Sequence, residues 1–227
     1  MRPHRNRLGF TLIEIMVVVG IIAVLAALTT LQMGEWLANQ RVKAAARSAA
    51  DAYQLARSEA IRTGSNHIVF FGSPGDTDPA GTLLVGVNGS WVPILILNDG
   101  PPTTANCQID GGEATRGIPP GSDVSWGVSK ATVKVPDDPG KAPFSPPQSS
   151  GRTFADPSNN AVNWVLFRPD GIPVSFTFAG GTCGQIAGTG SGGGALYITN
   201  GERDYAVVLS PLGSARVHLW SGNAWSS

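Results

Sequence analysis

The chain has 227 residues, a formal net charge of zero and a charged fraction of 14%. This size allows one sizeable domain with an appended element, and the low charge disfavours disorder driven by repulsion. Up to Arg62, eight Lys or Arg residues accompany four Asp or Glu residues, whereas eight bases meet twelve acids beyond it. The acid excess of the larger part argues against broad, charge-driven binding of nucleic acid.

A long apolar segment follows a short basic leader. Arg2, Arg5 and Arg7 come first, and twenty residues without charge then separate Glu14 from Glu35. With a rise of ~1.5 Å per residue, a helix of this length roughly spans the ~30 Å hydrocarbon core of a membrane. The positive-inside rule would keep the arginines cytoplasmic and send the rest of the chain outward. An ordinary signal peptide would have a shorter apolar core, and a plain membrane anchor would give Glu14 no purpose.

Helix-forming residues continue from Glu35 to Arg62 without Gly or Pro. Apolar residues recur there at steps of three and four, which marks one buried stripe: Val42, Ala45, Ala49, Ala52, Tyr53, Ala56 and Ala60. We expect one helix with a transmembrane half, residues 10–34, and an amphipathic half, residues 35–62, that backs a domain. The alternative is a pair of helices broken near Gly34.

The remaining residues, 63–227, show strand-like runs separated by Gly, Pro, Asn and Asp, which predicts an antiparallel β domain and an α+β fold class. Residues 98–160 read as a loop-rich insertion and residues 181–195 as a second flexible loop. The expected strands are His67–Phe71, Thr82–Val87, Val92–Leu97, Val124–Val128, Thr132–Val135, Val162–Arg168, Val174–Phe178, Ala195–Thr199, Tyr205–Leu209 and Ala215–Trp220.

The sequence offers little chemistry for an active site. Cys107 and Cys183 permit one disulfide in an exported domain, and two unpaired thiols are the alternative. His67 and His218 stand singly in expected strands, which is typical of packing or surface residues. Gly188–Gly193 has the Gly-x-Gly-x-x-Gly pattern, but a strand follows it, which favours a flexible loop over a dinucleotide site. Asp76–Asp78 and Pro136–Asp138 could touch calcium but lack the spacing of an EF-hand loop, which favours solvated turns. We therefore expect a protein that is not an enzyme and needs no cofactor.

The string "LGFTLIEIMVVVGIIAVLA" closely resembles the class III leader of type IV pilins and type II secretion pseudopilins. The resemblance implies that prepilin peptidase removes residues 1–9 by cutting between Gly9 and Phe10, and that Phe10 is then N-methylated. It also makes Glu14 the acidic fifth residue of the mature chain. In that family this carboxylate pairs with the N-terminal amine of a neighbouring subunit during assembly.

Three further segments resemble minor pseudopilins and pilins of the GspH/FimT type: Asp51–Phe71, Trp164–Pro173 and Glu202–Trp220. The resemblance implies a structural subunit of a type II secretion system, anchored in the bacterial inner membrane with its β domain in the periplasm. Its partners would be prepilin peptidase, other pseudopilins and secreted cargo. The alternative is a minor pilin of a type IV pilus, acting in pilus assembly or DNA uptake. Of the arginine-rich closing motif of DNA-binding members, the chain keeps Arg216.

Overall fold

The computed structural model describes residues 10–86, 89–111, 113, 115–118, 124–145 and 151–226, with the backbone alone for residues 27–32, 116 and 118. The chain divides into two compact units, Met1–Ala38 and Asn39–Ser227. Its elements are α1 (Leu12–Thr63), β1 (His67–Phe71), β2 (Ile94–Asn98), β3 (Thr115–Ile118), β4 (Ser125–Trp126), β5 (Trp164–Phe167), β6 (Pro173–Val174), β7 (Phe176–Ala179), β8 (Thr182–Ile186), β9 (Gly194–Thr199), β10 (Asp204–Leu209), β11 (Ala215–Trp220) and β12 (Trp225–Ser226).

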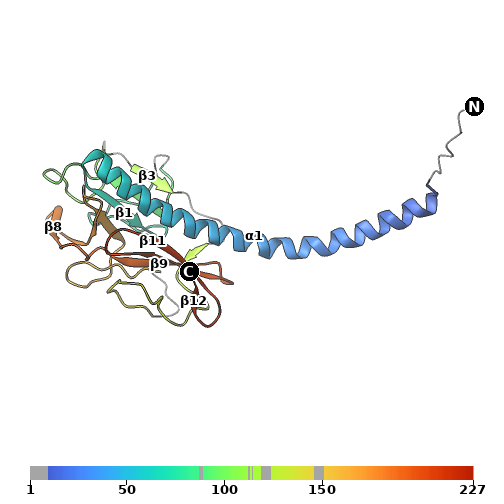
Figure 1. Ribbon diagram of the computed structural model, residues 1–227. Coiled ribbons are helices and arrows are strands. Elements are labelled where there is room, and N and C mark those ends of the chain that lie inside the picture. The colour runs from blue at the N-terminus through green and yellow to red at the C-terminus, as the bar shows by residue number, and fades with distance from the viewer. Residues whose placement is uncertain are drawn as a thin grey trace, which may run out of the picture. The chain divides into compact units, whose positions relative to one another are not determined.

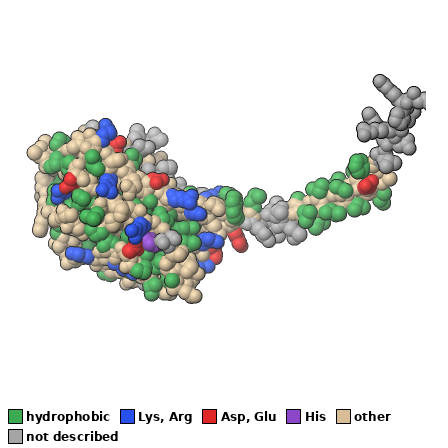
Figure 2. Space-filling model, viewed as in Figure 1, with side chains coloured by type: hydrophobic (Ala, Val, Ile, Leu, Met, Phe, Trp, Pro, Cys, Tyr) green, Lys and Arg blue, Asp and Glu red, His purple; other side chains and the backbone are tan. Residues whose placement is uncertain are grey.

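Helix α1 is a single element of 52 residues, and it continues through Gly34, where a break was the alternative. In its first part, apolar side chains cover the helix on the visible face (Figure 2), and the large hydrophobic side chains between Phe10 and Leu25 are 48% to 79% exposed. Within the described residues, no helix is both long enough and apolar enough to cross a membrane. The transmembrane assignment of residues 10–34 therefore stays a prediction.

In the second unit, the amphipathic part of α1 packs on both five-stranded sheets (Figure 1). The buried stripe follows the predicted spacing, except that Ala46 is fully buried where Ala45 was expected and Ala45 is partly buried. Because most of the stripe is alanine, the helix backbone can lie close to the strands. The stripe consists of Val42, Ala46, Ala49, Ala52, Tyr53, Ala56 and Ala60.

The strands form two antiparallel sheets, which confirms the α+β class. The first sheet has the order β3-β2-β1-β5-β6, and the second has the order β12-β11-β10-β9-β4. A separate two-stranded ribbon pairs β7 with β8. Strand β1 is central in the first sheet because it pairs with β2 on one side and β5 on the other.

Both faces of each sheet are covered, which explains why β1, β9 and β10 are buried along their whole length. One face carries α1. On the far face of the first sheet, Phe70 and Leu97 pack with Phe176 of the ribbon and with Cys107. Residues of the segment 128–144 cover the far face of the second sheet, where they pack on β9 and β10. The described part of the insertion therefore supplies part of the core.

Some strand predictions were wrong. Thr132–Val135 is not a strand. Backbone groups within and just before it bond to side chains rather than to another strand: Ala131 donates its N–H to Asp204, and Val135 donates its N–H to the Tyr197 hydroxyl. In Thr82–Val87, the described residues form isolated bridges at Leu83 and Val85, and position 87 lies outside the described residues. Pro173–Ala179, predicted as one strand over Val174–Phe178, divides into β6 and β7. The strands that the sequence did not predict are β3, β8 and β12.

The expected flexible loop 181–195 also needs correction, because it contains β8. Strand β8 is mostly exposed and pairs with β7 alone among the described strands, so it lacks the apolar alternation that predicts a strand from sequence. Strand β3 was also missed because its residues do not form a strand-like pattern. A side chain at Gly117 would lie 2.8 Å from Val92, so close packing there requires a residue that is a poor strand former.

Candidate functional site

The start of α1 carries the residues that the sequence predicted to be functional. Thr11 caps the helix: its hydroxyl accepts the N–H of Glu14 at 3.3 Å, and its carbonyl accepts the N–H of Ile15 at 3.3 Å. Thr11 and Glu14 have the spacing of a capping box, so the acid also suits the helix terminus by itself. Phe10 is 79% exposed. Gly9 lies outside the described residues.

Glu14 is exposed in the first turn, among large apolar side chains that are also exposed. A negative charge is favourable there because of the partial positive charge of a helix N-terminus. Were this surface covered by other apolar helices, the carboxylate would lose its water and would need a cationic partner. The geometry is thus compatible with the predicted assembly contact. The processing residues and the assembly contact stay predictions.

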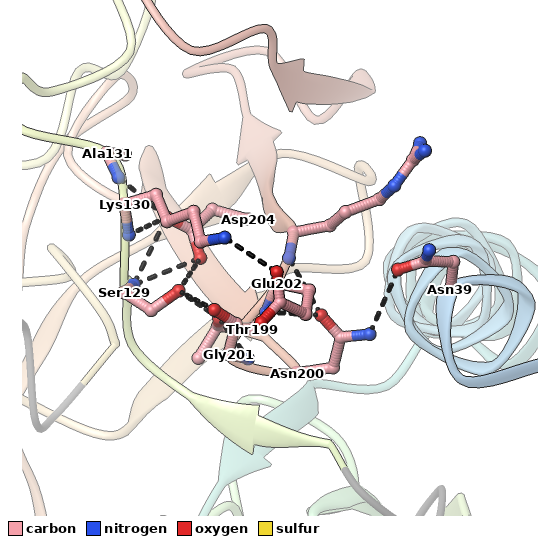
Figure 3. A network of polar contacts seen from close by, with 10 residues as sticks. Asn39, Ser129, Lys130, Ala131, Thr199, Asn200, Gly201, Glu202 and Asp204 are labelled. Carbon is pink, nitrogen blue, oxygen red and sulfur yellow. Dashed lines mark hydrogen bonds and ion pairs between the residues drawn. The ribbon is translucent and has the colours of Figure 1, made fainter. Parts of the chain in front are cut away.

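A buried carboxylate, Asp204, organises one end of the β domain (Figure 3). Asp204 accepts the N–H groups of Ser129, Lys130 and Ala131 at 2.6–3.1 Å, and the Ser129 hydroxyl at 3.0 Å. Burial alone would raise the pKa of Asp204, but hydrogen bonds from Thr199 and from these backbone groups outweigh it and lower the pKa. The side chain therefore joins the insertion to the β9–β10 hairpin as an anion.

The same hairpin contacts α1, since Asn200 Nδ2 donates to Asn39 Oδ1 at 3.2 Å (Figure 3). Lys130 and Glu202 form an ion pair of 2.7 Å at the rim of this network, with side chains that are 50% and 72% exposed. Exposed pairs of this kind contribute little to stability. This cluster is structural, and the sequence analysis missed it because its partners lie more than seventy residues apart.

Two neighbouring acids of the insertion, Asp137 and Asp138, lie near the closing strand β11. The side chain of Asp138 is buried and accepts hydrogen bonds from the Thr153 hydroxyl at 2.8 Å and the Tyr197 hydroxyl at 2.9 Å. Its neighbour Asp137 lies 3.2 Å from His218 Nε2 and 3.8 Å from Arg216 Nη1. Arg216 and His218 of the closing strand therefore have an acidic residue of the insertion beside them. This arrangement lowers the positive potential that a nucleic acid would meet there.

Cys107 and Cys183 form a disulfide, one of the two states that the sequence allowed, and it joins the insertion to the β7–β8 ribbon. Asp99 lies beside it and accepts the N–H groups of Asn106 at 3.1 Å and Cys107 at 3.0 Å. Burial raises the pKa of Asp99 to about 6, against the opposing effect of these hydrogen bonds, with Glu113 adding a smaller repulsive effect.

Among the described residues, Asp99 and the two cysteines are the group of His, Cys, Asp or Glu side chains close enough to share a metal ion. The two sulfur atoms are bonded to each other, so they do not act as thiolate ligands in this state. His67 is buried in β1 with Nδ1 3.3 Å from the Ser65 carbonyl, and burial lowers its pKa. His67 and His218, the described histidines, are thus both buried.

The comparisons with known proteins identify two regions of the chain. Residues 4–30 match the prokaryotic N-terminal methylation motif. Residues 45–213, which include most of the chain, match the model of the type II transport protein GspH. No curated protein and no solved structure matches the chain significantly. With a long helix leading into antiparallel sheets and the methylation motif at its start, the chain belongs to the GspH family, which is a pilin-like family.

Proposed function

We propose that the chain is a structural minor pseudopilin of a type II secretion system. The observation that carries the proposal is the order of the two family matches, with a methylation motif over residues 4–30 and a GspH region over residues 45–213. In this proposal prepilin peptidase cuts between Gly9 and Phe10 and methylates Phe10. The mature subunit then joins other pseudopilins in a short filament that drives protein secretion, and neither step needs a cofactor or catalytic residue of this chain.

The location follows from the same residues. Before assembly the apolar part of α1 lies in the bacterial inner membrane, with the basic leader on the cytoplasmic side and the β domain in the periplasm. The supporting observation is the exposure of the large apolar side chains between Phe10 and Leu25, which are unfavourable in water. The disulfide supports an oxidising compartment for the β domain.

Glu14 supplies the assembly contact. An ionised group at the centre of a membrane helix costs about 2.5–3.5 kcal/mol by insertion scales, and the cost is smaller near the helix N-terminus. The methylated amine of a neighbouring mature subunit would offset the remainder by forming an ion pair away from water. A subunit that slides by one helical turn loses this pair, so the pair sets the position at which subunits stack.

The test replaces Glu14 by Ala and by Gln in the full chain. Both variants are expected to be cleaved and inserted in the membrane but to be absent from the isolated filament. Glu35→Gln is the matched control, because Glu35 is also an exposed acid of α1 and lies beyond the apolar span. Normal incorporation of both Glu14 variants would refute the assembly role.

The finer alternative is a minor pilin of a type IV pilus that acts in pilus assembly or DNA uptake. Arg216 is 70% exposed, but Asp137 lies 3.8 Å from it, which disfavours DNA as a partner. Deletion of the gene distinguishes the two systems. We expect loss of exoprotein secretion with pili retained, and the reverse phenotype would favour the pilus alternative.

A further inference from the structure

The second unit contains a cavity of about 450 Å³ on its surface, which lies within the size range of ligand sites in proteins. Its walls come from five parts of the fold: the stretch of α1 from Arg41 to Ser48, residues 73–74 after β1, the residues at the start of β2, strand β4, and Ile198 of β9. Its lining is mainly apolar, with Trp91 and Trp126 as the largest side chains. None of these residues belongs to the apolar first part of α1.

Trp126 is held in place as one wall. Its indole N–H donates to the Gly72 carbonyl at 2.9 Å, which links β4 of the second sheet to the end of β1 in the first sheet. Trp91 differs, because its Nε1 atom is buried and finds no acceptor among the described residues. Leaving a buried donor without a partner is unfavourable.

Strand β4 gives the cavity a backbone edge. It is the last strand of the second sheet and pairs with β9 through Ser125 and Trp126. No further strand pairs with its outer side among the described residues. A free strand edge presents N–H and C=O groups that a segment in extended conformation can pair with, and such strand addition is a recurrent mode of peptide recognition.

The charge of the lining favours an acidic occupant. Among the described lining residues, Arg41 carries the only formal charge. A guanidinium has five N–H donors, so Arg41 can bind a carboxylate in addition to groups of its own chain. The cavity thus offers a positive charge, two tryptophans and a strand edge. A polypeptide segment can use all three, whereas a hydrocarbon can contact only the tryptophans.

We propose that this cavity binds a short, extended segment of a partner polypeptide, with apolar side chains against Trp91 and Trp126, backbone paired to β4 and a carboxylate near Arg41. The partner surface thus contains no residue of the apolar first part of α1, which carries Glu14. The proposal goes beyond the proposed function and does not depend on it, since the cavity is a feature of the second unit in whichever filament the subunit joins.

The test measures binding of a dye-labelled peptide, acetyl-Leu-Val-Thr-Val-Leu-Glu, to the full chain in detergent micelles by fluorescence anisotropy. Ala44 is exposed on α1 and lines the cavity, so Ala44→Trp should fill the cavity without disturbing the core. Ser58→Trp is the matched control, because Ser58 is exposed on the same helix outside the lining. We expect Ala44→Trp to weaken binding at least about tenfold and Ser58→Trp to leave it unchanged.

A second arm tests the charge. Arg41→Gln should weaken binding of the Glu peptide by about fivefold and should not weaken a peptide with Gln in that place. The proposal is overturned if wild type does not bind the Glu peptide, or if Ala44→Trp binds it as tightly as wild type. Equal binding of the Glu peptide and a Lys counterpart would also overturn it, because it would show that only apolar contact is involved. Equal circular dichroism spectra and melting temperatures of the variants confirm that each one folds.

Discussion

Replacing Asp204 by Asn tests whether one buried carboxylate joins the insertion to the second sheet. In the structure Oδ2 accepts the N–H groups of Lys130 and Ala131 at 2.6 Å each, and Oδ1 accepts the N–H and the hydroxyl of Ser129 at 3.0 Å each. The side-chain amide of the variant has one acceptor oxygen in place of two. Its NH2 group would face N–H or O–H groups that also donate, so those hydrogen bonds are lost. Hydrogen bonds to a charged group contribute about 1.5–3 kcal/mol each, so we expect a loss of about 3 kcal/mol.

For a domain of this size, such a loss lowers the melting temperature by about 6–12 °C. The assay is thermal unfolding of the full chain in detergent micelles, followed by circular dichroism. Glu202→Gln is the control, because it removes the exposed pair with Lys130 in the same network and should change stability by less than about 1 kcal/mol.

The effect of Asp204 should also depend on pH. Its pKa is lowered in the folded state, so its contribution is present above the unfolded value of about 3.9 and is lost as pH falls through the lower folded value. The difference in free energy of unfolding between wild type and Asp204→Asn should therefore be largest at neutral pH and should shrink below about pH 4. A variant that melts within about 1 °C of wild type at neutral pH would refute the reasoning.

Three further predictions concern the interior of the second unit. Tyr53→Phe should stabilise the protein by about 1 kcal/mol in urea unfolding, because the Tyr53 hydroxyl is buried without a partner among the described residues; a clear loss of stability would contradict this. Burial raises the pKa of Asp99 to about 6, so wild type should gain stability relative to Asp99→Asn as pH falls from about 7 to about 4, and parallel pH profiles would count against it. Cys107→Ala with Cys183→Ala should cost about 4 kcal/mol, since the bridge closes a loop of 76 residues, and reductant should destabilise wild type but not this variant.

Much of the fold could be predicted because local pattern and tertiary packing agree. The apolar run and the alanine stripe predicted α1, including its passage through Gly34. Strands β1 and β11 have the predicted bounds, and β9 and β10 begin one residue earlier. These strands are rich in β-branched and aromatic residues, and their pairing partners are strands of the same kind.

The failures come from segments whose structure depends on distant partners. Residues 132–135 alternate like a strand, but buried polar side chains such as Asp204 and Tyr197 bind the backbone around them, and these partners are more than sixty residues away. The exposed strand β8 depends on pairing with β7 and on the disulfide rather than on its own residues. No local pattern carries such information.

The candidate site shows the same division. Glu14 could be predicted from the motif alone, because a single acid near the start of an apolar helix is unusual and the neighbouring residues are specific. The cavity beside Trp91 could not, because its walls combine α1, the start of β2 and β4.

Processing at the N-terminus tests the central claim most directly. Intact-mass and N-terminal fragment spectra of the protein isolated from its native membrane should show a chain that begins at Phe10 and carries one methyl group on its amine. A chain that retains residues 1–9 with an unmodified amine would contradict the account, because Glu14 would then have no mature N-terminal amine to pair with.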